Sequence, residues 1–234
     1  MTQLFFVTAT GTGVGKTFVS RGLSRALVRR GLAVAAVKPL ETGCQPEPED
    51  AHALGRACSR PELTHAPGLY RAPLPLAPYA ATLAGCPQPP PIAALAATLR
   101  ELVAGADLGL VEGAGGLLVP YDEHEDLADL AAELEAPLLV VAPDALGTLS
   151  HTLSLVACAR ARGLPVTALV LVRKPLAEPD PSRESNARIL AERLPGIPLF
   201  VFAESQDDDD DLADRAELSG LAEWIAARIA KNPS

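Results

Sequence analysis

Two lysines and several oxygen-bearing side chains in this sequence have the types and spacing needed to bind phosphate. The stretch TATGTGVGKT places Gly11, Gly13 and Gly15 before Lys16 and Thr17. Glycines let the backbone turn its N–H groups toward one point, and the lysine supplies a point charge for the outer phosphates. The threonine hydroxyl is a typical ligand of Mg²⁺. The pattern therefore predicts a phosphate-binding loop for a nucleoside triphosphate.

The elements around this loop support that interpretation. The strict pattern of glycine, four residues, glycine and lysine is not met, because its first glycine would fall on Thr10. An apolar run at residues 4–8 precedes the loop, however, and apolar residues recur at helical spacing after Lys16. Strand, loop and helix in this order favour phosphate binding over a glycine-rich turn with a surface lysine.

A second lysine and two carboxylates are expected at the same edge of the sheet. Lys38 ends the next predicted strand, in VKPLETG, and Glu112 ends a later one, in VEGAGG. Ligands of open parallel sheets bind beyond the carboxyl ends of the strands. Since Mg²⁺ prefers oxygen ligands, we expect Thr17, Asp50 and Glu112 to hold that ion. The alternative for Asp50 is a simple helix N-cap.

Lys38 distinguishes between two classes of nucleotide enzyme. Nucleotide hydrolysis needs one phosphate-loop lysine, so a lysine at the neighbouring strand end indicates a second anion beside the γ-phosphate. The alternative is a lysine whose ammonium group simply extends into solvent.

The order of predicted elements gives the fold class. Apolar strands alternate with amphipathic helices, which predicts a three-layer α/β/α fold with a mostly parallel central sheet of the P-loop NTPase type. We expect one domain over residues 1–234. The expected strands span residues 4–8, 32–38, 108–112, 137–143, 164–172 and 197–202, and the expected helices span 16–30, 92–102, 126–134, 149–162, 184–194 and 214–230.

The charge and the cysteine content of the chain exclude several classes of partner and site. The net charge of −9 argues against nucleic acid and anionic membranes, which both favour clusters of lysine and arginine. The four cysteines have no C-x-x-C spacing, which favours free, buried thiols. No signal pattern or membrane span is found in the sequence, so we expect a cytoplasmic protein.

Two segments have no assigned role. The proline-rich residues 60–91 could form a disordered linker, but their apolar residues argue against one. The alternative is a folded loop over the site, with Tyr70 and Tyr79 as candidate contacts. The acidic run at residues 207–211 is expected to be a solvated loop without function.

Four motifs together resemble one family. VTATGTGVGKT, VKPLETG, VEGAGGLLVP and LGTLSHTLS occur in the order found in dethiobiotin synthetases. The resemblance covers most of the chain and is weak beyond Pro175. It implies that ATP, CO₂ and 7,8-diaminononanoate give dethiobiotin, ADP and phosphate, with Mg²⁺ as cofactor. It also implies a homodimer.

The resemblance implies roles for three groups of residues. Residues around carbamate and γ-phosphate would be the catalytic Lys16, Lys38 and Thr12, together with Thr42 and Gly116 at the substrate. Nucleotide would be held by Gly11, Gly13, Val14, Gly15, Lys16, Thr17, Glu112 and Gly115. The substrate carboxylate would bind the partner subunit at a helix start formed by Gly147, Leu149 and Ser150, for which the alternative is an ordinary helix cap.

The sequence departs from the family pattern at three positions. Gly13 stands where the family usually has glutamate, and Ala9 where it often has glycine. Val172 stands where an asparagine usually reads adenine, and valine cannot hydrogen-bond to a base edge. We therefore expect a weak preference for ATP over other triphosphates.

Two other classes of protein have the same kind of phosphate-binding loop and are alternative interpretations of this sequence. Positioning ATPases of the ParA/MinD kind have a second loop lysine, where this chain has Gly11. Amide ligases related to cobyrinate synthesis usually carry a long glutaminase domain, for which this chain is too short.

Overall fold

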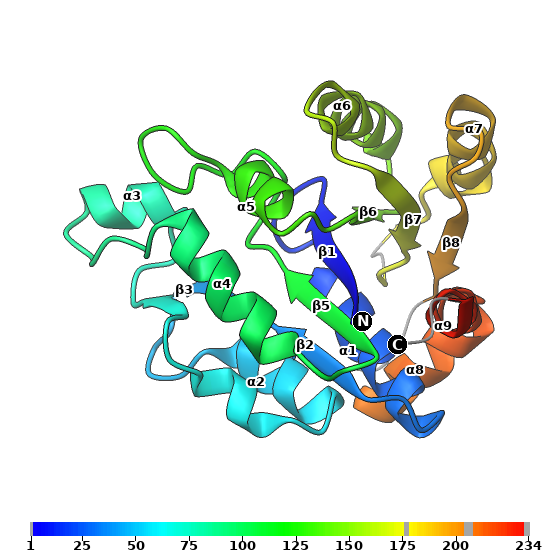
Figure 1. The fold of residues 1–234 in the computed structure, drawn as a ribbon. Coiled ribbons are helices and arrows are strands. Elements are labelled where there is room, and N and C mark those ends of the chain that lie inside the picture. Colours follow the sequence, from blue (N-terminus) through cyan, green and yellow to red (C-terminus); the bar gives the residue numbers. More distant parts are fainter. Residues whose placement is uncertain (1, 176–177, 204–207, 232–234) are drawn as a thin grey trace.

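The computed structural model describes residues 2–175, 178–203 and 208–231, and at its centre lies a six-stranded parallel sheet (Figure 1). The strand order is β2-β5-β1-β6-β7-β8. The strands are β1 (Gln3–Ala9), β2 (Val34–Val37), β5 (Leu108–Glu112), β6 (Leu138–Pro143), β7 (Val166–Val172) and β8 (Leu199–Phe202). The expected α/β/α fold class is confirmed, and the loops that follow β2, β5 and β1 lie at neighbouring strand ends.

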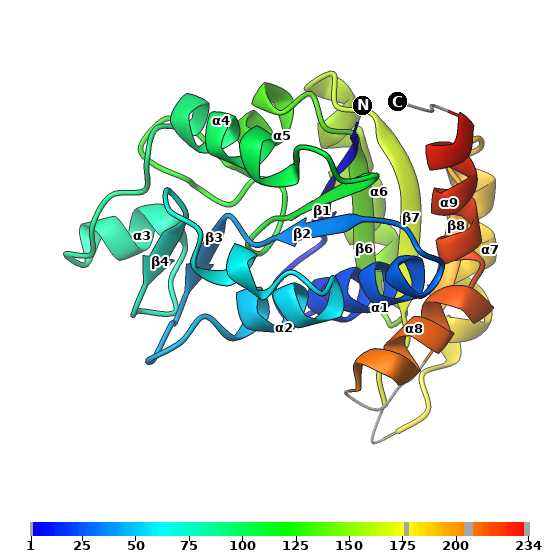
Figure 2. The same cartoon turned by 60° about the horizontal axis from the view of Figure 1, so that its bottom comes forward.

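Helices cover both faces of the sheet, which explains why its strands are apolar on both sides. Figures 1 and 2 show α1, α2, α8 and α9 on one face and α4, α5, α6 and α7 on the other. The helices are α1 (Lys16–Arg29), α2 (Glu49–Ala57), α4 (Ile92–Val103), α5 (Leu127–Glu133), α6 (Thr148–Ala161), α7 (Asn186–Arg193), α8 (Asp209–Leu218) and α9 (Leu221–Lys231). All five residues of β5 are buried, including the ionisable Glu112.

The proline-rich segment is folded, as its apolar content predicts. It forms the 3₁₀ helix η1 (Pro61–His65), the short strand β4 (Tyr70–Ala72) and the helix α3 (Pro78–Leu83). β4 pairs in parallel with β3 (Leu40–Thr42), so this segment is tied to the chain that follows Lys38. The disordered-linker alternative is therefore wrong. A second 3₁₀ helix, η2 (Pro181–Glu184), precedes α7.

Two expectations about the C-terminal region are wrong. A single helix over residues 214–230 was expected, but the chain forms α8 and α9, separated at Gly220, whose φ is 80°. The acidic run is also not a solvated loop. Asp208 caps α8 by accepting hydrogen bonds from the N–H groups of Asp210 and Asp211, and Asp207 lies outside the described residues.

Ion pairs attach the start of α8 to α1. Arg21 pairs with Asp209 at 2.7 Å, and Arg25 pairs with Asp210 at 2.8 Å. Aspartates in the first turn also interact favourably with the positive end of the helix dipole. The acidic residues thus stabilise the start of α8 and its packing on α1. The number of like charges in the sequence does not predict this role.

The cysteines are free thiols, as expected, but of the four only Cys58 is buried. In the described part of the chain, every helix is too short or too polar to cross a bilayer.

Candidate active site

The phosphate-binding loop connects β1 to α1 and contains backbone that favours glycine. Gly13 and Gly15 have φ values of 69° and 114°, in the left-handed region. A Cβ atom on Gly15 would lie 3.0 Å from Cγ1 of Val172, so a side chain at this position would require the Val172 side chain to shift by a few tenths of an ångström. Gly15 is the N-cap of α1, and the helix begins directly at Lys16. The free N–H groups of this helix start provide an anion-binding site.

The Lys16 side chain lies across the loop and is buried. Its Nζ donates to the carbonyl oxygen of Gly115 at 2.8 Å and to that of Gly11 at 3.4 Å. Burial and, to a lesser extent, repulsion from Lys38 lower the pKa of the Lys16 ammonium to about 8. A phosphate brought into this position would therefore meet a cation whose charge is under-compensated by the protein.

Lys38 lies directly after β2 and is engaged with two carboxylates. Its Nζ lies 2.7 Å from Oε1 of Glu112 and 2.8 Å from Oδ2 of Asp50. Its side chain is 5% exposed, so the solvent-directed alternative for this lysine is wrong. Burial alone would lower the pKa of the Lys38 ammonium, but Glu112 and then Asp50 attract the charge and raise that pKa above its ordinary value.

Glu112 lies at the end of β5, between Lys38 and the phosphate-binding loop. Its Oε1 also accepts a hydrogen bond of 2.9 Å from Oγ1 of Thr17. Its Oε2 is buried and has no hydrogen-bond partner among the described residues. A buried carboxylate oxygen without a partner is costly, and a cation is one way of satisfying it.

Asp50 lies in the first turn of α2 and is not its N-cap, which is Pro48. The N-cap alternative is therefore wrong. Burial opposes ionisation of Asp50, yet Lys38 holds the pKa of its carboxyl below the ordinary value. Thr17, Asp50 and Glu112 thus bring three oxygen-bearing side chains together, a donor set that suits Mg²⁺.

A cavity of about 500 Å³ opens over these residues. Most of the expected site residues line it: Thr12, Gly13, Gly15, Lys16, Thr17, Lys38, Thr42, Asp50 and Gly115. Gly11 and Glu112 are not part of the lining, but they accept hydrogen bonds from the lining residues Lys16 and Lys38.

The comparisons with known proteins agree with this arrangement. A family model described as AAA domain matches residues 3–200. The ATP-dependent dethiobiotin synthetase BioD of Anaeromyxobacter dehalogenans (strain 2CP-1 / ATCC BAA-258) is 42% identical over 226 residues, which cover 96% of this chain and 97% of the relative. The protein of the same name from Aquifex aeolicus (strain VF5) is 35% identical over 223 residues, which cover 95% and 97%.

This chain belongs to the dethiobiotin synthetase family. Among solved structures, the MinC:MinD cell division protein complex of Aquifex aeolicus is similar with a TM-score of 0.52 and 12% identity, covering 99% of this chain and 97% of that chain. At this identity the likeness shows the shared fold alone. The positioning-ATPase and cobyrinate-type alternatives are therefore not favoured over membership in the dethiobiotin synthetase family.

Two residues of this family member's site were missed from the sequence. Glu41 is buried, and its two oxygens accept hydrogen bonds from the backbone N–H groups of Asp50 and Ala51 at 2.8 and 2.9 Å. It therefore fixes the start of α2, and with it Asp50. Its position in VKPLETG, three residues after Lys38, was a usable signal. Lys174 lines the cavity and donates to the carbonyl oxygen of Gly13. It follows β7 by two residues, so the strand-end rule already used for Lys38 would have found it.

Other expected residues do not line this cavity. Val14 and Gly116 are not part of its lining, and Gly147, Leu149 and Ser150 lie at the start of α6. Within the family resemblance these three serve the partner subunit, which a single chain does not test. Tyr70 and Tyr79 are likewise outside the lining, and the proline-rich segment contributes residues 75–78 instead.

The family resemblance matches Val172 to an asparagine that reads adenine. The Val172 side chain is buried beneath the phosphate-binding loop, against Gly15. An apolar side chain in this place supports the backbone of the loop and has no group that hydrogen-bonds to a base.

Proposed function

We propose that this chain is an ATP-dependent dethiobiotin synthetase, which converts 7,8-diaminononanoate, CO₂ and ATP to dethiobiotin, ADP and phosphate. Family membership supports the reaction class. The observation that carries the proposal is the presence of two lysines, Lys16 and Lys38, in one cavity at neighbouring strand ends. Two cations are needed because the reaction brings a carbamate and a triphosphate together.

The first step is carbamate formation. One amine nitrogen of the diamine attacks the carbon of CO₂, a C–N bond forms, and the nitrogen loses a proton. An alkylamine resembles lysine, so its neutral form costs roughly 4–5 kcal/mol at pH 7. Nearby cations disfavour the protonated amine and stabilise the anionic carbamate. Thr12, Thr42 and Gly116 are the further residues that we assign to the substrate.

The next steps transfer phosphate and close the ring. A carbamate oxygen attacks the γ-phosphorus, and the bond between that phosphorus and the ADP oxygen breaks. The second amine then attacks the carbonyl carbon, expels phosphate and loses a proton, which leaves a cyclic urea. Lys16 and Lys38 stabilise the charge that accumulates on the transferring oxygens, and this kind of stabilisation is the main catalytic term in phosphoryl transfer.

We infer that Thr17, Asp50 and Glu112 hold Mg²⁺ in this reaction. The unpartnered Oε2 of Glu112 and the all-oxygen donor set fit that ion. When bound, Mg²⁺ neutralises charge on the β- and γ-phosphate oxygens. Glu112 and Asp50 also contact the Lys38 ammonium group in this structure, so the carboxylates that would hold the ion also position Lys38 beside it.

Two further features of the proposal come from the sequence. We infer a homodimer in which Gly147, Leu149 and Ser150 bind the carboxylate of the partner's substrate, since α6 begins there with free N–H groups. A cytoplasmic location also remains a prediction. From the structure, Leu76 and Val119 are apolar residues of the cavity lining, and we expect them to contact the carbon chain of the diamine.

The direct test is product formation. Purified protein is incubated with ATP, Mg²⁺ and 7,8-diaminononanoate, with and without ¹³C-bicarbonate, and the products are analysed by mass spectrometry. We expect dethiobiotin that carries one ¹³C and phosphate release that depends on the diamine. ATP hydrolysis that is unaffected by the diamine would contradict the proposal.

A further inference from the structure

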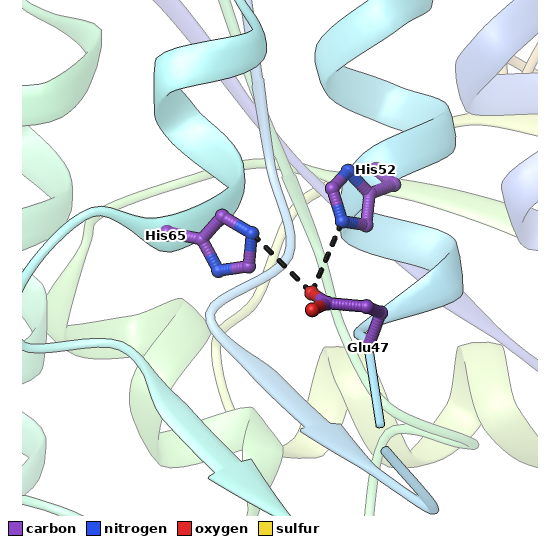
Figure 3. Close-up of side chains that lie close together, drawn as sticks. All are labelled: Glu47, His52 and His65. Carbon is purple, nitrogen blue, oxygen red and sulfur yellow. Dashed lines mark hydrogen bonds and ion pairs between the residues drawn. The ribbon is translucent and has the colours of Figure 1, made fainter. Parts of the chain in front are cut away.

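Three side chains that could bind a metal ion meet away from the phosphate-binding loop (Figure 3). Both imidazole rings, of His52 and His65, direct Nε2 at the same oxygen, Oε2 of Glu47. The distances are 3.3 Å from His52 and 3.5 Å from His65. The ligand atoms of all three residues lie within 4.8 Å of one another.

These distances fit a tetrahedral metal centre. Zinc binds imidazole nitrogen at about 2.0–2.1 Å and carboxylate oxygen at about 2.0–2.2 Å, so two ligand atoms of a tetrahedral site lie about 3.3–3.5 Å apart. The two nitrogen–oxygen distances already match this value. The two imidazole nitrogens lie within 4.8 Å of each other, and both side chains are partly exposed, 42% for His52 and 60% for His65, which leaves them free to rotate toward a bound ion.

The backbone beneath the cluster holds the three residues in place. Oγ1 of Thr64 donates to the carbonyl oxygen of Ala51 at 3.3 Å, and these residues directly precede His65 and His52. The N–H group of His52 donates to the carbonyl oxygen of Pro48, next to Glu47, at 3.0 Å. These hydrogen bonds fix the backbone of η1 and of the first turn of α2 next to the three side chains. Only the side chains therefore need to be ordered when an ion binds, which lowers the entropic cost of binding.

We propose that Glu47, His52 and His65 form a binding site for a divalent transition-metal ion of the Zn²⁺ class, with water at the remaining position. Two imidazoles and one carboxylate select zinc, cobalt or nickel over Mg²⁺, which prefers oxygen ligands. The site is separate from the magnesium ligands proposed above and does not depend on the proposed reaction. His52 lies two residues after Asp50 on α2, so a bound ion would also hold the helix turn that carries Asp50.

Cobalt binding tests the proposal, because tetrahedral Co²⁺ with imidazole ligands absorbs visible light. The full chain is titrated with Co²⁺ in a large excess of Mg²⁺, which keeps the oxygen site filled. We expect one saturable Co²⁺ site in the wild type, competed by Zn²⁺. His52→Ala and His65→Ala should each weaken Co²⁺ binding by at least about tenfold, as the loss of a ligand requires. Glu47→Gln should weaken it as well.

Two matched variants serve as controls. His124→Ala removes another exposed histidine, and Cys44→Ser removes the thiol nearest in sequence to Glu47. Both should bind Co²⁺ like the wild type. Far-UV circular dichroism and Zn²⁺-dependent thermal shifts are recorded for every variant, and the shift should be lost only with the three proposed ligands. A wild-type chain without saturable Co²⁺ binding, or histidine variants that bind Co²⁺ as tightly as the wild type, would overturn the proposal.

Discussion

The ammonium group of Lys38 lies 2.7 Å from the carboxylate of Glu112, and the Glu112 side chain is fully buried. Each charge therefore depends on the other for its compensation inside the protein. The same pair joins the strand that precedes VKPLETG to the strand that ends in VEGAGG, since β2 and β5 are neighbours in the sheet. We therefore expect this contact to affect both the proposed reaction and the stability of the fold.

Replacing Lys38 with methionine should affect both activity and stability. Turnover should fall by on the order of 10²–10³-fold, as for loss of one charge-stabilising donor. The free energy of unfolding should fall by about 3–5 kcal/mol, because Glu112 is left buried without its cation. Steady-state kinetics and urea denaturation measure the two effects.

A double variant separates these effects. Lys38→Met with Glu112→Gln removes both charges, so it should regain much of the stability but none of the activity. Lys231→Met changes an exposed lysine on α9 and serves as the control. Full activity in Lys38→Met would mean that this lysine does not act on the reacting anions.

The two left-handed glycines of the loop should tolerate substitution differently. Gly15→Ala combines a φ of 114°, which strains any residue other than glycine, with a Cβ that would crowd the Val172 side chain at 3.0 Å. Left-handed backbone alone costs a non-glycine residue roughly 1–2 kcal/mol. We expect the affinity for Mg²⁺–ADP, measured by calorimetry, to fall by about tenfold or more.

Gly13→Ala is the matched control for this change. Gly13 has a φ of 69°, but a Cβ there would have no atom within 4 Å. The family resemblance implies glutamate at this position, so we expect a side chain here to be compatible with the loop. If Gly13→Ala and Gly15→Ala bound nucleotide equally well, packing against Val172 would not be what requires glycine at position 15.

Base selectivity should be weak. Val172 is buried and has no hydrogen-bonding group for a base edge, and a lost hydrogen bond is worth about 1–3 kcal/mol of discrimination. We expect the kcat/KM for ATP to exceed that for GTP or CTP by no more than about tenfold. A competition assay measures this ratio directly, and a preference of about 10³-fold or more would show that other groups read the base.

The acidic turn of α8 should contribute through its cap more than through its exposed ion pairs. Asp208→Ala removes acceptors for the N–H groups of Asp210 and Asp211 and should cost about 1 kcal/mol of unfolding free energy. Asp214→Ala removes an exposed pair with Arg29 and should cost less than about 0.5 kcal/mol. Equal losses in denaturant titrations would mean that the cap has no special weight.

The elements that were predictable from sequence are those with strong periodicity or an obligatory chemical pattern. The loop from Gly11 to Thr17 and the strand ends at Lys38 and Glu112 combine apolar runs with isolated polar residues, and burial leaves such residues few options. That these residues lie close together follows only from the strand order of the structure, in which β5 lies between β1 and β2.

The features that were missed depend on contacts between segments far apart in the chain. The role of Glu41 depends on where α2 begins, and the acidic run gains its partners from arginines of α1 about 185 residues earlier. The break at Gly220 was missed because apolar spacing continues on both sides of it. The His52–His65 contact likewise follows from the packing of η1 on α2, which no local pattern predicts.

Transfer of oxygen from CO₂ to phosphate tests the central claim most directly. If a carbamate oxygen attacks the γ-phosphorus and ring closure expels phosphate, freshly dissolved C¹⁸O₂ must place one ¹⁸O in each phosphate released. A brief reaction with ATP, Mg²⁺ and 7,8-diaminononanoate, followed by mass spectrometry of the phosphate, shows whether it does. We predict phosphate with one ¹⁸O at each turnover that yields dethiobiotin. Phosphate that carries oxygen only from water and ATP would contradict the account.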